Sequence, residues 1–176
     1  MKLTEQEFLE HELGWGISYD NEAFRNLAAI TADQVKGLGI KTVLDFGAGT
    51  GVYSDAFYKA GYKVSAFEIF GAHREYMKEK VPHINIIDKP ITTDLMAFIE
   101  TAEHMTDDEL NALFKDITPN YILFSSTSDK TDFDETWGHI NVKTQDEWIL
   151  YFNSLSYELI NNFSAPTTWT KLFKHR

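Results

Sequence analysis

The sequence predicts an α/β fold with a mostly parallel sheet that ends in an antiparallel pair of strands. Short apolar runs, typical of buried strands, alternate with helix-length amphipathic segments over most of the 176 residues. The last two apolar runs are separated only by Ser164-Ala165-Pro166, which is too short for a helical crossover. The final strands are therefore expected to run antiparallel.

A single domain is predicted over residues 1–176, with an N-terminal helical cap or lid over residues 1–40 and the core over residues 41–176. Hydrophobic residues make up 43% of the chain, which is enough for one continuous core. Helices are expected at Thr4–His11 and Asn21–Lys36, ahead of the first strand. One face of the second helix would carry Phe24, Leu27, Ala28, Ile30 and Val35.

The first half of the core is predicted as strand, turn, helix, strand, helix and strand. The first strand begins at Val43 and leads into a glycine turn. Gly61 and Pro82 are expected to end the two helices, because glycine caps helices and proline cannot continue them. After the turn, the elements in chain order are a helix at Val52–Ala60, a strand at Lys63–Glu68, a helix at Ala72–Lys80 and a strand at Ile84–Ile87.

The second half of the core contains two helix starts of the same kind. Thr106–Glu109 and Thr144–Glu147 each place a threonine three residues ahead of a glutamate, which is the pattern of a capping box. The two helices should run to about Ile117 and Leu155. The strands around them are expected at Leu95–Ile99, Tyr121–Thr127, Tyr157–Phe163 and Thr168–Phe173.

A glycine-rich turn joins the first strand to the next helix in the segment Asp45-Phe46-Gly47-Ala48-Gly49-Thr50-Gly51. Missing side chains let an adenosine-containing cofactor approach backbone N–H groups at the start of a helix. A dinucleotide would require the third glycine one residue later, at the position of Val52. The charge of Asp45 would repel a pyrophosphate but hold an ammonium or sulfonium group. The turn therefore favours S-adenosyl-L-methionine.

Asp45-x-Gly47-x-Gly49-x-Gly51 resembles the first motif of the class I S-adenosylmethionine-dependent methyltransferases, and Glu68 ends the next strand as an acid does in that family. The resemblance covers nearly the whole chain. It implies a three-layer, Rossmann-like sheet of seven strands, mostly parallel with an antiparallel C-terminal strand. One departure is Thr118-Pro119-Asn120, where the family has Pro-Gly-Gly. The alternative, a glycine turn that binds nothing, is less favoured because of Glu68.

The resemblance also implies which residues hold the cofactor. Glu68 would bind both ribose hydroxyls, Asp45 the amino-acid end, and Asp88 the adenine amino group. Asp88 is equally typical of a turn. Three apolar residues would sandwich the adenine ring or belong to the core: Phe67, Ile69 and Phe70. The complete predicted set is Asp45, Gly47, Ala48, Gly49, Gly51, Glu68, Ile69, Asp88 and Glu100.

A second group of ionisable residues, Glu100-Thr101-Ala102-Glu103-His104, directly follows the fourth strand. Two carboxylates and an imidazole on a loop can bind a hard divalent ion or act as acid and base. Glu-x-x-Glu-His here resembles the small-RNA 3′-terminal 2′-O-methyltransferases and some quinone-biosynthesis O-methyltransferases. In the first group, a further histidine after the fifth strand completes a magnesium or manganese site, and His139 stands at that place.

This resemblance implies a Mg²⁺ or Mn²⁺ site formed by Glu100, Glu103, His104 and His139, with Glu103, His104 and His139 as catalytic residues. A divalent ion would lower the pKa of an acceptor hydroxyl and orient it toward the sulfonium methyl. Without a metal, His104 or His139 would serve as general base. The structural alternative is that Glu103 and His104 only hold the loop in place.

The charge and the composition of the chain indicate which classes of partner and which location to expect. A net charge of −11 repels nucleic-acid phosphates, which disfavours nucleic acid and favours a small-molecule acceptor. No apolar run approaches the roughly 20 residues that span a bilayer. The absence of cysteine predicts a cytoplasmic location. A monomer or a homodimer is expected.

The predicted function is therefore methylation of an oxygen of a small polyhydroxylated or catechol-like acceptor, with S-adenosyl-L-methionine as donor. Two alternatives remain. An RNA 3′-end 2′-O-methyltransferase would need a basic groove beside His139, where the nearby lysines are Lys130 and Lys143. A non-catalytic binding module would keep the fold without the activity, although the intact Asp45, glycines and Glu68 argue against it.

Overall fold

The structure is a computed structural model that describes residues 3–128, 130–131 and 134–176. It divides into two compact units, Met1–Pro90 and Ile91–Arg176. The first unit contributes three strands in the order β3-β2-β1, and the second contributes four in the order β4-β5-β7-β6. The predicted seven-stranded α/β arrangement is confirmed by these strands and by the helices between them.

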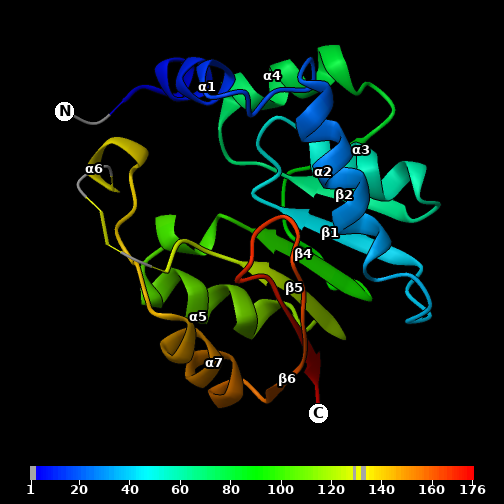
Figure 1. Cartoon of the computed structure of the whole chain (residues 1–176), viewed down its shortest axis with the longest axis vertical. Coiled ribbons are helices and arrows are strands. Elements are labelled where there is room, and N and C mark those ends of the chain that lie inside the picture. The colour runs from blue at the N-terminus through cyan, green and yellow to red at the C-terminus, as the bar shows by residue number, and fades with distance from the viewer. Residues whose placement is uncertain (1–2, 129, 132–133) are drawn as a thin grey trace. The chain divides into compact units, whose positions relative to one another are not determined.

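The strands of the first unit run parallel, and Phe46 lies opposite Phe67 in the register of β1 and β2. Both strands therefore end at the same level, so that the glycine turn and Glu68 begin side by side. Figure 1 shows the helices of this unit, and the elements are α1 (Glu5–Gly14), α2 (Glu22–Asp33), β1 (Thr42–Phe46), α3 (Val52–Lys59), β2 (Lys63–Phe67), α4 (Gly71–Lys80) and β3 (Asn85–Ile87).

The predicted elements of this unit are confirmed, with ends that differ by a few residues, but one face of α2 is not. Ile30 is 56% exposed, whereas Ala28 and Ala32 are completely buried. Successive residues of a helix are about 100° apart, so a residue two positions away from both alanines points to the opposite side. The prediction that Ile30 shares the buried face is therefore wrong.

Helix α1 is attached to α4 by three kinds of contact. The carboxylate of Glu5 accepts a hydrogen bond from the N–H of Gly71 at 2.7 Å, where α4 has no cap from its own Phe70. The ring of Phe8 packs edge-on against Phe70, with centroids 5.7 Å apart. Glu12 lies 2.8 Å from Nε2 of the buried His73. Helix α1 therefore has polar and aromatic anchors on α4, and the role of residues 1–40 as a cap or lid stays a prediction.

Gly51 begins α3 in a conformation that favours glycine. Its φ is +76°, and a Cβ there would lie 2.9 Å from Cγ2 of Val81 and 3.0 Å from Cγ of Met77. We expect Gly51→Ala to lower the free energy of unfolding by about 2 to 5 kcal/mol, because left-handed backbone costs about 1–2 kcal/mol and overpacking about 1–3 kcal/mol. Urea denaturation of both proteins measures this loss.

Gly39 provides the matched control, since its φ is +74° and a Cβ there would meet nothing within 4 Å. Gly39→Ala should therefore lose only the backbone part, about 1–2 kcal/mol. Equal losses in the two variants would contradict a packing role for Gly51.

In the second unit, β4 and β5 are parallel, β7 pairs antiparallel with β5, and β6 pairs antiparallel with β7. Both capping boxes are present, with Thr106 and Thr144 as the N-caps. The elements are β4 (Leu95–Ile99), the 3₁₀ turn η1 (Ala102–His104), α5 (Asp107–Asp116), β5 (Tyr121–Ser125), α6 (Asp134–Trp137), α7 (Gln145–Ser154), β6 (Tyr157–Asn162) and β7 (Lys171–His175).

The last strand begins three residues later than predicted. Thr167 donates its N–H to Oγ1 of Thr170 at 3.1 Å, and the N–H of Thr170 donates to the Thr167 carbonyl at 3.2 Å. This turn occupies the residues that would otherwise start the strand. The short helices η1 and α6 were also not predicted, since three or four residues are too few for a periodic pattern.

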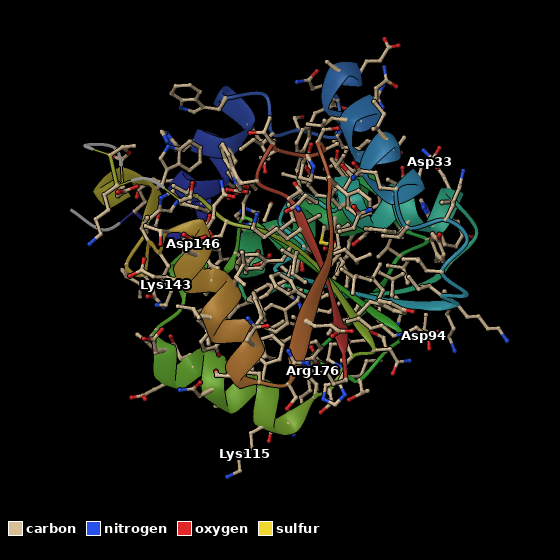
Figure 2. All side chains as sticks on the ribbon, turned by 60° about the horizontal axis from the view of Figure 1, so that its bottom comes forward. Asp33, Asp94, Lys115, Lys143, Asp146 and Arg176 are labelled. Carbon is tan, nitrogen blue, oxygen red and sulfur yellow. The ribbon has the colours of Figure 1, made fainter. Side chains whose placement is uncertain are left out.

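An aromatic core holds α5 and α7 on this sheet. Trp148 and Phe152 are buried, and the ring of Phe152 lies 4.8 Å from Phe124 and 4.6 Å from Phe173. Figure 1 shows α5 and α7 side by side, and Figure 2 shows Lys143 and Asp146 near the start of α7. The opposite end of this layer is polar, where Lys143 pairs with Asp107 of α5 at 2.7 Å.

Candidate functional site

The glycine turn after β1 is bonded to the end of β2. Gly47, Gly49 and Gly51 all have positive φ, at +74°, +52° and +76°. The N–H groups of Gly47 and Ala48 donate to the carbonyl of Phe67 at 2.8 and 3.1 Å. These two bonds fix the start of the turn against the end of β2 and use the N–H groups of Gly47 and Ala48 within the protein. The role of the turn residues in holding a cofactor stays a prediction.

Glu68 ties this turn together with its side chain. The carboxylate is 5% exposed, and its two oxygens accept from the N–H groups of Gly49 and Phe70, both at 2.8 Å. An ionised carboxylate offers about four acceptor positions, so two remain for hydroxyl donors. The geometry therefore suits the predicted role of Glu68 toward two ribose hydroxyls, and it also makes Glu68 part of the turn itself.

Asp45 is a buried acid at the end of β1. It is 3% exposed, and the hydroxyl of Ser54 donates to its Oδ2 at 2.6 Å. Burial raises the pKa of Asp45 from its ordinary 3.8 to about 6, the Ser54 hydrogen bond opposes this rise, and the charge of Glu68 adds to it. The two predicted acids therefore interact electrostatically. A cation bound near them would relieve the cost of burying both charges.

The remaining predicted cofactor residues of the first unit lie on the surface. Ile69 is 76% exposed, which is unusual for a large apolar side chain and leaves it open to a ligand ring. The side chain of Asp88 is 87% exposed and lies 2.6 Å from Nη2 of Arg74. Arg74 was not predicted, because nothing in the local sequence indicates that it reaches the end of β3.

Two of the three candidates for the adenine ring are partly buried and contact other aromatic rings. Phe67 packs against Phe46, with ring centroids 5.0 Å apart, and Phe70 packs against Phe8. Their place beside the adenine ring stays a prediction. Ile69 alone of the three keeps its side chain largely exposed.

All three predicted catalytic residues are in the second unit, and the structure brings them together. Glu103, His104 and His139 each offer a ligand atom, and these atoms all lie within 4.8 Å of one another. The rings of His104 and His139 are 4.9 Å apart. The loop after α6 is held there because the N–H groups of Ile140 and Asn141 donate to the Glu103 carbonyl at 2.8 and 2.9 Å. We call Glu103, His104 and His139 the carboxylate–histidine cluster.

The charges of this cluster are strongly perturbed. Glu103 is completely buried; its Oε1 accepts from the Thr127 N–H at 3.3 Å, and its Oε2 has no hydrogen-bond partner among the described residues. Burial, followed by the charge of Glu100, raises the pKa of Glu103 well above its usual range. Burial and the nearby His139 lower the pKa of His104 to about 4. His104 is therefore neutral at pH 7.

Glu100 lies outside this group of three. Its Oε1 accepts from the indole N–H of Trp169 and its Oε2 from the hydroxyl of Thr127, both at 3.3 Å. Its backbone has a positive φ of +46°, which is strained for a glutamate. The structure therefore assembles three of the four predicted metal ligands and holds the fourth through Trp169. Sequence reasoning missed Trp169, which lies in the turn between β6 and β7.

His139 has a carboxylate partner that the sequence did not reveal. Its Nδ1 lies 2.9 Å from Oδ1 of Asp134, and its backbone N–H donates to the Asp134 carbonyl at 2.9 Å. The Thr131 N–H bonded to the Asp134 carboxylate, and then the bond to His139, lower the pKa of Asp134. Both side chains are largely buried, at 12% and 16% exposure. Nothing in the local pattern distinguishes this aspartate from other loop acids.

Comparison with known proteins agrees with the fold. A family model for a methyltransferase domain matches residues 19–176. An uncharacterised methyltransferase of Bacillus licheniformis is 30% identical, over 59% of this chain and 57% of its own length. The chain thus spans just over half of that relative. No helix in the described part of the chain is long and apolar enough to cross a membrane.

Two solved structures have the same fold. An amino pentose methyltransferase from Micromonospora echinaspora, with bound S-adenosylmethionine, superposes with a TM-score of 0.68 at 14% identity, covering 100% of this chain and 99% of that one. A mitomycin 7-O-methyltransferase gives a TM-score of 0.60 at 12% identity, covering 98% of this chain and 67% of that one. With a family model that matches most of its length, this chain belongs to the methyltransferase domain family.

Proposed function

We propose that the chain transfers a methyl group from S-adenosyl-L-methionine to an oxygen of a small hydroxylated acceptor. The observation that carries this proposal is the pair of buried acids, Asp45 and Glu68, at the matching ends of β1 and β2. One carboxylate can bind the cationic amino-acid end of the donor, and the other can accept hydrogen bonds from its ribose hydroxyls. Membership of the methyltransferase family and the fold shared with a donor-bound structure support the proposal.

Each acid has its own part in donor binding. Asp45 would face the cationic amino-acid end, because its ionised form is destabilised by burial and gains from a neighbouring positive charge. Glu68 would accept the ribose hydroxyls with the positions that Gly49 and Phe70 leave open. Ile69 would cover one face of the adenine ring, and Asp88 would accept from its amino group. Gly47, Ala48 and Gly51 shape the turn against which the donor lies.

The carboxylate–histidine cluster would act on the acceptor. His104 is neutral near pH 7, so its imidazole can take the acceptor hydroxyl proton as the oxygen attacks the methyl carbon. A C–O bond forms while the C–S bond breaks, and the bonding electron pair stays on sulfur. The products are a methyl ether, protonated imidazole and S-adenosylhomocysteine. His139 would support the same transfer. The positive charge of the imidazolium would favour the ionised form of Glu103, which would then stabilise that imidazolium.

A divalent ion such as Mg²⁺ or Mn²⁺ fits this cluster. The buried Oε2 of Glu103 lacks a partner among the described residues, and two imidazoles lie within 4.8 Å of that side chain's ligand atom. Glu103, His104 and His139 would hold the ion, with Glu100 as a further ligand only if it left Trp169. Such an ion would lower the pKa of the acceptor hydroxyl.

Calorimetry with S-adenosyl-L-methionine and S-adenosylhomocysteine, with and without Mn²⁺ or Mg²⁺, tests the proposal. We expect the wild-type chain to bind both compounds, Asp45→Ala to lose binding, and His104→Ala to keep it. A panel of catechols and polyhydroxylated compounds, read by formation of S-adenosylhomocysteine, then tests turnover, which His104→Ala should lose. If neither donor nor product binds at millimolar concentration, the proposal fails.

The same experiment separates the alternatives. Donor binding without turnover on any hydroxylated compound would favour a binding module, and turnover only on RNA ends would favour a 2′-O-methyltransferase. Lys143 is bonded to Asp107 and Asn141, which leaves less basic surface for RNA than the sequence suggested. A small acceptor, a cytoplasmic location and a monomeric or homodimeric state remain predictions.

A further inference from the structure

We propose that Asp134 is a positioning residue, which holds the proton of His139 on Nδ1 and thereby keeps Nε2 as the nitrogen that carries the lone pair. This inference rests on the proposed function, because it explains how His139 keeps the Nε2 lone pair that proton transfer or metal binding requires. It is tested separately from donor binding, which depends on residues of the first unit.

Two hydrogen bonds join Asp134 to His139. Oδ1 of Asp134 lies 2.9 Å from Nδ1 of His139, and a second bond joins the His139 N–H to the Asp134 carbonyl. Two bonds from one residue fix both the backbone and the ring of His139. The other carboxylate oxygen is itself held, since the N–H of Thr131 donates to Oδ2 at 2.7 Å. The carboxylate is therefore fixed in place before it contacts the ring.

The bond between the Asp134 carboxylate and the His139 ring decides which ring nitrogen carries the proton. An ionised carboxylate is only an acceptor, so Nδ1 of His139 must be the protonated nitrogen in the neutral ring. The lone pair then resides on Nε2. A general base or a metal ligand needs that lone pair, and in histidine sites the partner of the other nitrogen decides which one is available. Exposure of only 12% and 16% shields this bond from competing water.

The same segment also fixes the proton position of the second histidine, His104. Nδ1 of His104 lies 3.3 Å from the carbonyl oxygen of Gly138, the residue next to His139. A carbonyl is also only an acceptor, so His104 likewise carries its proton on Nδ1. The segment 134–139 therefore sets the tautomer of both histidines, one through a side chain and one through the backbone. Two imidazoles with Nε2 lone pairs are what the carboxylate–histidine cluster requires.

The experiment is a two-bond ¹H–¹⁵N correlation spectrum of the full chain at pH 8, with ¹⁵N-labelled histidine. We expect His139 in the wild type to be protonated at Nδ1. In Asp134→Asn, the amide NH₂ can donate to Nδ1, and the proton then moves to Nε2, so we expect most of His139 to change tautomer. Asp134→Glu should retain the wild-type tautomer. A merely structural role would not move this signature.

Asp108 supplies the control, because it is an exposed aspartate of the same unit, in the first turn of α5, and allows the same substitution. Asp108→Asn should leave the His139 tautomer unchanged. Donor binding by calorimetry should be unchanged in Asp134→Asn, while turnover falls by about 10- to 100-fold, as outer partners of functional histidines commonly cause. If the wild-type chain did not bind the donor, the proposed function would be wrong, while the tautomer of His139 could still be measured.

The inference is overturned if wild-type His139 is protonated at Nε2, and this outcome needs no variant to fold. It is equally overturned if Asp134→Asn leaves the Nδ1 proton in place, or if Asp108→Asn moves it to the same extent. Circular dichroism of the variants identifies any that do not fold, and for those the wild-type spectrum and Asp134→Glu decide the question.

Discussion

Asp45→Asn is expected to make the protein more stable at pH 8 while it weakens donor binding about 10- to 100-fold. The folded state raises the pKa of Asp45 from 3.8 to about 6, mainly by burial. Such a rise corresponds to about 3 kcal/mol, at about 1.4 kcal/mol per pKa unit. A group whose pKa is raised by folding contributes stability below its unfolded pKa, and that contribution is lost as the pH rises through its folded pKa.

Ionised Asp45 therefore lowers stability above about pH 6, and an uncharged asparagine, which can still accept from Ser54, does not. We expect the free energy of unfolding of Asp45→Asn to exceed that of the wild type by about 1–3 kcal/mol at pH 8, and the difference to vanish near pH 4. Urea denaturation at several pH values measures it. Asp116→Asn, at an exposed site, should change stability by less than about 0.5 kcal/mol at either pH.

Asp45→Asn should weaken donor binding, although it stabilises the fold. Loss of a charge-assisted contact to the donor is worth about 1.5–3 kcal/mol, or about 10- to 100-fold in affinity. The wild-type affinity itself should fall as the pH drops below about 6, because the carboxylate then becomes protonated. A donor affinity in Asp45→Asn equal to that of the wild type would show that Asp45 does not contact the cationic donor.

Glu68→Gln is expected to lose donor binding and stability together. Both oxygens of Glu68 accept backbone N–H groups, from Gly49 and Phe70. A glutamine presents one oxygen and one NH₂, so one of those N–H groups would face a donor. A buried donor without a partner costs about 1–3 kcal/mol. Part of this loss is offset, because removal of the Glu68 charge eases the ionisation of Asp45.

We therefore expect a net loss of about 1–2 kcal/mol in the free energy of unfolding, with donor affinity reduced at least about 10-fold. Urea denaturation and calorimetry measure the two effects. Glu75→Gln provides the control on the exposed side of α4, where Glu75 pairs with Lys78 at 2.6 Å. If Glu68→Gln were as stable as Asp45→Asn, the carboxylate would not be holding the turn.

The sequence was sufficient for the elements whose causes are local. Both capping boxes were predicted from threonine and glutamate three residues apart, and both are present. Gly61, at a φ of +97°, ends α3 as expected. These features depend on contacts within one turn of chain, and a short stretch of sequence contains everything that determines them.

Other features depend on neighbours from elsewhere in the fold. Ile30 was expected to share a face with Ala28, but it is 56% exposed while Ala28 is completely buried. The rings of Phe67 and Phe70 contact Phe46 and Phe8, and the first N–H groups of the glycine turn donate to the end of β2. These partners lie far away along the chain, so the local sequence does not reveal them.

What the sequence by itself determined is the order of the strands and helices, the glycine motif, and the residue types at the candidate sites. Only the tertiary structure decided their chemical state: the burial that raises the pKa of Asp45, the Glu103 oxygen that no described residue hydrogen-bonds, and the Asp134 carboxylate on His139. Local order follows from short-range hydrogen bonds and periodic burial. Charge and proton positions follow from desolvation and from contacts between distant residues, which only the folded chain brings together.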